Sequence, residues 1–219
     1  MKIVQSSAVL PALRRAAHGE PVAVLLDGPQ MASLGALPFA SKLETVTTSP
    51  AWPGPSRPYK GIVRTIPGLI EAEDFDEGGE GVAYHDTDPE NRETHQPPYR
   101  ETGVDLEWRE SASGHFNLGW TRPGEWLIYT VDVLEKGSYT IEMMVACNKP
   151  GGTFHLEFNG ADRTGPVVVP DTGGWTIMKP FSKKGVALDA GRFAMKLVMD
   201  KGGEKGSIGD IDYFRFVKE

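Results

Sequence analysis

Hydrophobic and polar residues alternate along the chain after residue 65. The alternation is strictest in three segments, EWLIYTVDV (125–133), TFHLEFN (153–159) and RFAMKLVM (192–199). A period of two places every second side chain on the same face of a strand, so that one face is buried and the other meets solvent. The residues predicted to be buried are Leu127, Tyr129, Val131, Val133, Phe154, Leu156, Phe158, Phe193, Met195, Leu197 and Met199.

Turn-forming sequences separate the predicted strands. They read EKGS, FNGAD, DTGG, DAGR and KGGEKG, in a chain with 26 glycines and 17 prolines. Short strands with frequent turns favour antiparallel sheets that pack face to face. The sequence therefore predicts an all-β fold over residues 66–219, a two-sheet antiparallel β-sandwich of jelly-roll type. It shows no internal repeat and no heptad pattern.

The first 65 residues follow a different pattern. SAVLPALRRAAHGEPVAVLLDG (7–28) suggests a short helix and then a buried strand, whereas SPAWPGPSRPYKG (49–61) has the composition of a linker. We predict an N-terminal segment of unknown fold at 1–48, a Pro/Gly-rich linker at 49–65 and the β-sandwich at 66–219. The N-terminal segment is interpreted either as the remnant of a preceding domain or as a segment that packs on the sandwich.

Composition narrows the possible partners. The net charge of −7 and the pI near 5.3 argue against a nucleic-acid partner, because binding to phosphates requires clustered Lys and Arg. No apolar run approaches the ~20 residues of a membrane span, and the opening MKIVQSSAVLPALRR does not resemble a signal peptide. The single cysteine, Cys147, excludes an internal disulfide; at the end of YTIEMMVAC it is predicted to be a small buried residue.

Two tryptophans lie beside turns. Trp120 belongs to NLGWTRPGEW (117–126), and Trp175 follows Gly173 and Gly174 in DTGGW (171–175). Such rings either close the ends of the core or remain open as platforms for a ligand. Two open rings facing each other suit a sugar, whose C–H bonds contact an aromatic face while its hydroxyls form hydrogen bonds at the edge. The residues alone leave both interpretations open. The other tryptophans are assigned to core or sheet surface (Trp126), the linker (Trp52) and a strand end (Trp108).

Acidic residues form a second candidate site. Glu71 and Glu73 of IEAEDF (70–75) are two apart in a predicted strand, on one face, with Cα atoms ~6–7 Å apart. Asp212 of DIDYF (210–214) would join them if the first and last strands of the sandwich pair. Carboxylate oxygens with backbone carbonyls suit calcium. Alternatively, Glu71 and Glu73 would act as the paired carboxyl groups of a retaining glycoside hydrolase, which lie ~5–5.5 Å apart.

Other motifs carry less information. Asp86, Asp88 and Asn91 in YHDTDPEN (84–91) have a spacing that faintly resembles calcium loops, but the glycine and the terminal glutamate are missing, so we interpret them as a solvated acidic loop. The five histidines show no metal-binding spacing, and no GxSxG, Walker A or CxxC motif occurs. The sequence shows no activated nucleophile.

Six segments between about residue 66 and residue 219 carry a resemblance to a known family. They are IPGLIEAEDFDEGGEGVAYHDTD (66–88), YRETGVDLE (99–107), NLGWTRPGEWLIYTVDV (117–133), GGTFHLEFNG (151–160), TGGW (172–175) and DIDYFRF (210–216). In these segments, and in their order and spacing, the chain resembles the family-6 carbohydrate-binding modules, noncatalytic domains attached to polysaccharide hydrolases. The resemblance implies a jelly-roll β-sandwich that holds a glycan in a loop-end cleft between two aromatic residues, with a structural calcium elsewhere.

Carried over by motif, Trp120 and Trp175 are the facing aromatics, and Asp210 is the polar residue at the base of the cleft. The implied function is noncatalytic binding of a polysaccharide of β-glucan, agarose or xylan type, which targets a linked glycoside hydrolase to its substrate. An extracellular or cell-surface location and a monomer are expected. A module whose tryptophans meet protein, in adhesion or scaffolding, is a further alternative.

The resemblance also assigns Glu71, Glu73 and Asp212 as calcium ligands. The chain departs from the family in two places. Asp210 stands where many members have asparagine, which removes an amide donor, and ENRETHQPPYR (90–100) replaces a glycine-rich turn. Strand alternation places Asp210 and Asp212 on the same side, so only twist or a bulge would allow them to serve separate sites.

Overall fold

The computed structural model describes residues 2–4, 22–24 and 55–219, and the chain divides into two compact units, Met1–Ala51 and Trp52–Glu219. In the first unit, β1 (Lys2–Val4) pairs in parallel with β2 (Val22–Val24). The helix predicted within 7–28 and Trp52 lie outside the described residues. The described residues contain no helix with the length and hydropathy of a membrane span.

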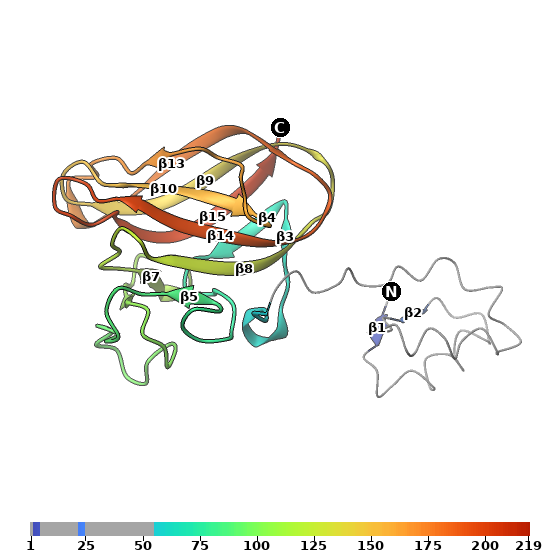
Figure 1. Ribbon diagram of the computed structural model, residues 1–219, viewed down its shortest axis with the longest axis horizontal. Coiled ribbons are helices and arrows are strands. Elements are labelled where there is room, and N and C mark those ends of the chain that lie inside the picture. The colour runs from blue at the N-terminus through green and yellow to red at the C-terminus, as the bar shows by residue number, and fades with distance from the viewer. Residues whose placement is uncertain (1, 5–21, 25–54) are drawn as a thin grey trace, which may run out of the picture. The chain divides into compact units, whose positions relative to one another are not determined.

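The second unit is a sandwich of two β-sheets (Figure 1). One sheet runs β11 (Ala161–Asp162), β10 (Thr153–Phe158), β14 (Gly191–Lys201), β8 (Trp126–Val133) and β3 (Arg64–Ile66), with β12 (Val167–Val168) on β10 and β5 (Tyr84–His85) on β8. The other runs β13 (Gly174–Leu188), β9 (Gly137–Cys147), β15 (Asp210–Lys218), β7 (Phe116–Leu118) and β6 (Leu106–Trp108), with β4 (Gly68–Glu71) on β15. Only β3 and β8 pair in parallel within these sheets, so the antiparallel β-sandwich prediction is confirmed.

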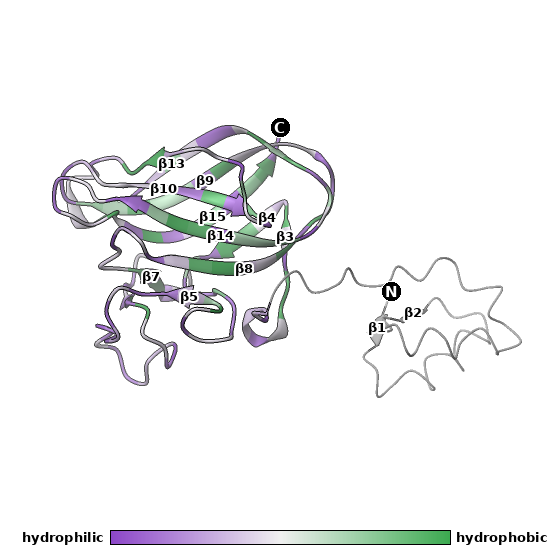
Figure 2. Cartoon of the chain, in the orientation of Figure 1, coloured by the Kyte–Doolittle hydropathy of each residue, from purple (hydrophilic) through white to green (hydrophobic). Residues whose placement is uncertain are grey.

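The core lies between the two sheets and is built from the alternating residues. All the residues predicted to be buried are buried except Phe193, which is partly exposed and packs against the core. Figure 2 shows hydrophobic residues along β8 and β14 and hydrophilic residues in the connecting loops. Burying a large apolar side chain contributes about 1.5–3 kcal/mol, so this repeated alternation is enough to fix which face of each strand turns inward. Cys147 is buried in this core, as predicted.

Residues 55–63, which precede the sandwich strands, contact the sandwich directly. The Ser56 hydroxyl donates to a carboxylate oxygen of Asp76 over 2.8 Å, and both residues are buried. The guanidinium of Arg100 lies 4.2 Å from the ring centroid of Tyr59 and 3.7 Å from that of Phe75. Cation–π contacts on two ring faces and a buried hydrogen bond hold this segment on the sandwich.

Candidate functional site

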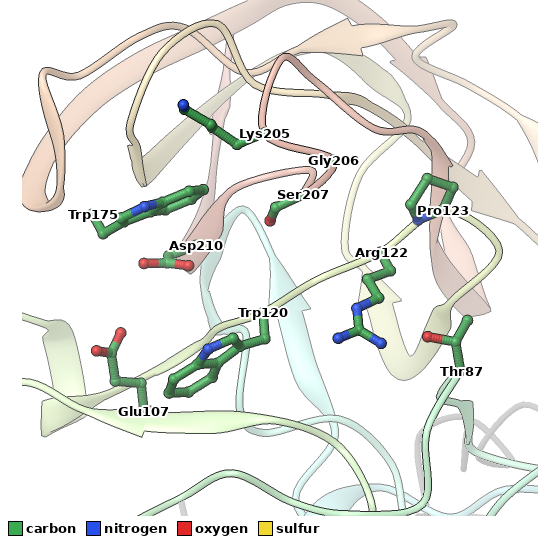
Figure 3. Close-up of a pocket in the computed structure, with 10 residues that line it drawn as sticks. All are labelled: Thr87, Glu107, Trp120, Arg122, Pro123, Trp175, Lys205, Gly206, Ser207 and Asp210. Carbon is green, nitrogen blue, oxygen red and sulfur yellow. The ribbon is translucent and has the colours of Figure 1, made fainter.

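A cleft of about 830 Å³ opens among the loops of the sandwich and is lined by residues from five separate parts of the chain. Figure 3 shows Trp175 and Trp120 on opposite walls, with the carboxylates of Asp210 and Glu107 between them. The structure therefore brings Trp120, Trp175 and Asp210, which are far apart in the sequence, into one cavity.

Trp120 is held open to solvent by an unusual backbone. Its side chain is 41% exposed and its φ is +46°, a left-handed conformation that bulky residues rarely adopt. The flanking residues fix this geometry. The Gly119 N–H donates to the carbonyl of Asp105 over 3.0 Å, and the Thr121 hydroxyl bonds both the carbonyl (2.7 Å) and the N–H (3.1 Å) of Gly209. Strain maintained by its surroundings is typical of a functional position.

Trp175 stands where β13 leaves the regular ladder. β13 pairs with β9 at Gly174, and the next pair is at Lys179, with a register shift between them. Trp175 therefore lies in an irregular stretch, after Gly173 with a φ of +96°. It is partly exposed and packs against the edge of the core. The two glycines allow the chain to turn before the ring, which places the indole at the cleft wall.

A buried arginine, which the sequence analysis missed, supports the residues that form the floor of the cleft. The Arg109 side chain, 8% exposed, donates from Nη1 to the carbonyl oxygen of Trp175 over 2.6 Å and from Nη2 to Asp210 Oδ2 over 3.2 Å. Nη2 also donates to Glu107, and Nε donates to Asn117 Oδ1 over 3.1 Å. Glu107 was missed as well. The available signal was the spacing of the two residues in LEWRE, which places them on one face of a strand.

The electrostatics of the floor reflect its burial. Burial, followed by the charge of Glu107, raises the pKa of Asp210 to about 8, although the charge of Arg109 lowers it. The floor thus presents two carboxyl groups around one guanidinium. Such a group of acceptors can receive hydrogen bonds from ligand hydroxyls.

Glu71, Glu73 and Asp212 meet in a different place. β4 pairs with β15, with Tyr213 opposite Glu71, so the strands that carry these residues are neighbours as predicted. The prediction that Glu71 and Glu73 share one strand face is wrong, because β4 ends at Glu71 and the chain turns at residues 72–73. The turn buries Glu73, which is 1% exposed.

This acidic cluster contains unsatisfied oxygens. One carboxylate oxygen each of Glu71 and Glu73 is buried and has no hydrogen-bond partner among the described residues. Burial, followed by the charges of Glu71, Asp74 and Asp212, raises the pKa of Glu73 to about 9. Burial also raises the pKa of Asp212 to about 7, with a contribution from Glu71. Carboxyl groups so arranged favour either a proton or a cation.

The donor set fits calcium in part. Hard oxygen donors and two unpaired buried oxygens are what such an ion requires. Within residues 55–219, however, no three His, Cys, Asp or Glu side chains form a group that could hold a metal. An ion here would therefore take its remaining ligands from backbone carbonyls or from the Ser113 hydroxyl, which donates to Glu71 Oε1 over 2.6 Å.

A β-bulge separates the roles of Asp210 and Asp212. β15 pairs Ile211 with Val145 and Tyr213 with Met144, so the register shifts at Asp212. Asp210 bonds Arg109 in the cleft, whereas Asp212 accepts hydrogen bonds from the backbone of Ser113. The extra residue changes the direction of the second side chain, and the two aspartates serve separate places.

The remaining candidates lie outside the cleft floor. Trp126 is half-buried in β8 beneath the Lys196 ammonium, 4.2 Å from the ring centroid, and Trp108 ends β6 with 46% of its surface exposed. Asp88 Oδ2 accepts hydrogen bonds from Arg92 over 2.8 Å and Arg122 over 3.0 Å. Its loop is therefore cross-linked by ion pairs rather than purely solvated.

Known proteins share this architecture. The structure of a β-1,3-glucan-binding family-6 module from Bacillus halodurans is 23% identical, with a TM-score of 0.53, over 71% of this chain and 98% of that one. A family-6 module of Cellvibrio mixtus lichenase 5A, solved with cellotriose, is 23% identical, with a TM-score of 0.51, over 70% of this chain and 98% of that one. These similarities establish the fold.

Sequence comparison identifies the family. The alpha subunit of clotting factor G from Tachypleus tridentatus is 31% identical over 100 residues, which are 45% of this chain and only 15% of that protein. Residues 98–218, more than half of the chain, match the profile of the carbohydrate binding module family 6. The chain therefore belongs to the family-6 carbohydrate-binding modules, which bind carbohydrate without catalysis.

Proposed function

We propose that this chain binds a polysaccharide in the cleft between Trp120 and Trp175, with one sugar ring between the two indoles. The observation that carries the proposal is that both rings, from separate parts of the chain, line one cleft of about 830 Å³. The carboxylates of Asp210 and Glu107 lie between them (Figure 3). This volume exceeds that of a single sugar ring, so neighbouring residues of a chain also fit.

The chemistry of the cleft suits a neutral sugar. The faces of the indoles accept the C–H bonds of a pyranose, and the floor carboxylates accept hydrogen bonds from its hydroxyls. Arg122, Lys205 and Ser207 line the same cleft and supply donors. One sandwiched ring gives modest affinity, with a Kd between micromolar and millimolar, or ~4–8 kcal/mol.

A β-glucan is the first ligand to test, since the two solved relatives are described with β-1,3-glucan and cellotriose. Agarose and xylan are the alternatives. We also propose that the module works outside the cell, attached to a glycoside hydrolase. It would hold that enzyme on its substrate by raising its effective concentration there.

A structural calcium at Glu71, Glu73 and Asp212 is part of the proposal. Its support is one buried carboxylate oxygen each in Glu71 and Glu73 that has no hydrogen-bond partner within residues 55–219. The same residues make a poor hydrolytic pair. Glu73 is 1% exposed and neither glutamate lines the cleft, so a glycosidic bond held between the indoles does not reach them.

A glycan screen tests this function. Calorimetry with laminarin, agarose, xylan and cellulose oligosaccharides should give saturable binding to at least one glycan by the wild-type chain. The Glu73→Gln variant should bind that glycan with the same Kd, and no reducing sugar should be released by either protein. Binding to none of the four would argue against the proposal, and sugar release abolished by Glu73→Gln would establish a hydrolase.

A further inference from the structure

Arg109 connects the Trp175 wall of the cleft to the floor through one buried group. It follows β6, the Trp175 carbonyl that accepts its Nη1–H lies in β13, and Asp210 begins β15. β6 and β13 are at opposite edges of their sheet. A planar guanidinium with five donors in a fixed fork can bond several acceptors at set angles, which lysine cannot do.

The bond to Trp175 replaces support that the sheet does not give. The register shift between Gly174 and Lys179 leaves Trp175 in an irregular part of β13. Its carbonyl oxygen lies 2.6 Å from Nη1 of Arg109, a short, charge-assisted hydrogen bond. The backbone that carries the indole is therefore held from the floor of the cleft.

The same guanidinium separates two acids. Glu107 and Asp210 both form ion pairs with Nη2 of Arg109, and the side chains of Asp210 and Arg109 are 6% and 8% exposed. The bond uses Oδ2 of Asp210, which leaves Oδ1 to accept from a sugar hydroxyl. Without the cation, the two acids would share a poorly solvated floor, in which only one of them can stay ionised.

We propose that Arg109 is a positioning residue for glycan binding, which fixes the Trp175 backbone and orients the Asp210 carboxylate. It contacts the groups that meet the sugar rather than the sugar itself. This inference rests on the proposed function, because its effect on affinity requires a glycan in the cleft. It also explains how the chain tolerates aspartate at position 210: the carboxylate has a buried counter-charge.

The first test compares matched arginine deletions. Arg109→Met should weaken binding of the glycan found in the screen at least tenfold. Arg192→Met is the control, since Arg192 is also largely buried, at 11% exposed, and makes two hydrogen bonds to Asp132 of 2.8 and 2.7 Å outside the cleft. Arg192→Met should lower the Tm and leave the Kd for the glycan unchanged. Equal Kd values for Arg109→Met and wild type would overturn the inference.

A second substitution separates positioning from general structure. In an Arg109→Met background, Asp210→Asn should cost less affinity than it costs in wild type, because the carboxyl group that Arg109 orients has already lost its partner. A purely structural role predicts the same cost in both backgrounds, and equal costs would contradict the inference. Arg109→Lys keeps the positive charge but not the planar guanidinium, and it replaces Arg109→Met as the test variant if Arg109→Met does not fold. Arg109→Lys should bind the glycan at least threefold more weakly than wild type.

A measurement without ligand distinguishes the two proposals. The indole N–H resonance of Trp175, assigned through Trp175→Phe, should shift or broaden in Arg109→Lys and stay in place in Arg192→Met. If wild type binds no glycan, the proposed function fails while this resonance still tests Arg109. An unmoved resonance in both arginine variants would show that Arg109 does not position Trp175.

Discussion

The backbone N–H of Ser113 donates to both carboxylate oxygens of Asp212, at 3.0 and 3.1 Å. The Ser113 hydroxyl donates to Glu71, and β15 pairs with β4 beside it. One short loop thus joins the last strand of the sandwich to an early one and gathers carboxyl groups away from the cleft. The consequence is a cluster that affects stability and that can be tested independently of sugar binding.

Calcium should stabilise this cluster. We expect the Tm of the wild-type chain to rise on adding calcium and to fall in a chelator, by an amount that corresponds to ~2.7 kcal/mol at a calcium concentration 100 times its Kd. Glu73→Gln removes a charged ligand and should abolish the calcium-dependent shift. Glu142→Gln is the control, because Glu142 is exposed on β9 and should keep the shift. Identical melting curves with calcium and with chelator would rule out the site.

Trp120→Gly should separate stability from binding. Glycine adopts a φ of +46° without steric strain, which should offset the indole packing that is lost, so the free energy of unfolding should change by less than about 1 kcal/mol. Glycan binding should be lost. Trp108→Gly is the control: Trp108 is 46% exposed, against 41% for Trp120, but lies in β6 outside the cleft, so stability should fall and binding should persist. A Trp120→Gly variant that loses as much stability as Trp108→Gly would show that the backbone is not strained.

His155 should make stability depend on pH. Burial lowers its pKa, but hydrogen bonds and charges from Asp200 and Glu157 outweigh burial, so the folded pKa lies above the ordinary value. A raised histidine pKa means that the folded state holds the proton more tightly. The stabilisation is therefore complete below pH ~6.5 and is lost as the pH rises through the folded pKa.

Denaturant unfolding of wild type and His155→Gln across pH 5–9 measures the contribution of His155 to the pH dependence of stability. The difference in unfolding free energy between them should be largest at the acid end and should shrink with rising pH. Asp200→Asn should flatten the dependence, because it removes the main charged partner. A difference that grows with pH would mean that the sign is wrong.

Asp76 should anchor residues 55–63. It accepts hydrogen bonds from the backbone N–H and the hydroxyl of Thr130, at 2.8 and 2.6 Å, and from the Ser56 hydroxyl. Ser56→Ala removes one partner and should cost about 1 kcal/mol, whereas Asp76→Ala leaves buried donors unsatisfied and should cost about 3 kcal/mol. Urea unfolding gives both values. Equal costs would mean that the bonds to Thr130 contribute nothing.

The alternation of hydrophobic and polar residues predicted the sheets well, because a strand with one buried face has an apolar side chain at every second position. Leu127, Tyr129 and Val131 are inward in the structure for the reason that their spacing indicated. The two cleft tryptophans could not be chosen from the residues alone, since a ring beside a turn also suits the end of a core. The family resemblance, rather than periodicity, singled them out.

Features that depend on pairing with another strand could not be predicted from the sequence. The bulge at Asp212 arises from the register against β9, which no property of DIDYF reveals. The burial of Glu73 could not be predicted either, because it depends on the turn that follows the end of β4 at Glu71. Arg109 carries no motif of its own, and its role appears only when Trp175 and Asp210 are brought to it by the fold.

Calorimetric titration of wild type and Trp175→Ala with the glycan identified in the screen tests the central claim most directly. If a sugar ring lies between the two indoles, removing one of them should weaken binding at least tenfold, and the substitution should leave the fold intact by circular dichroism. An unchanged Kd in a folded Trp175→Ala variant would contradict the assignment of the cleft.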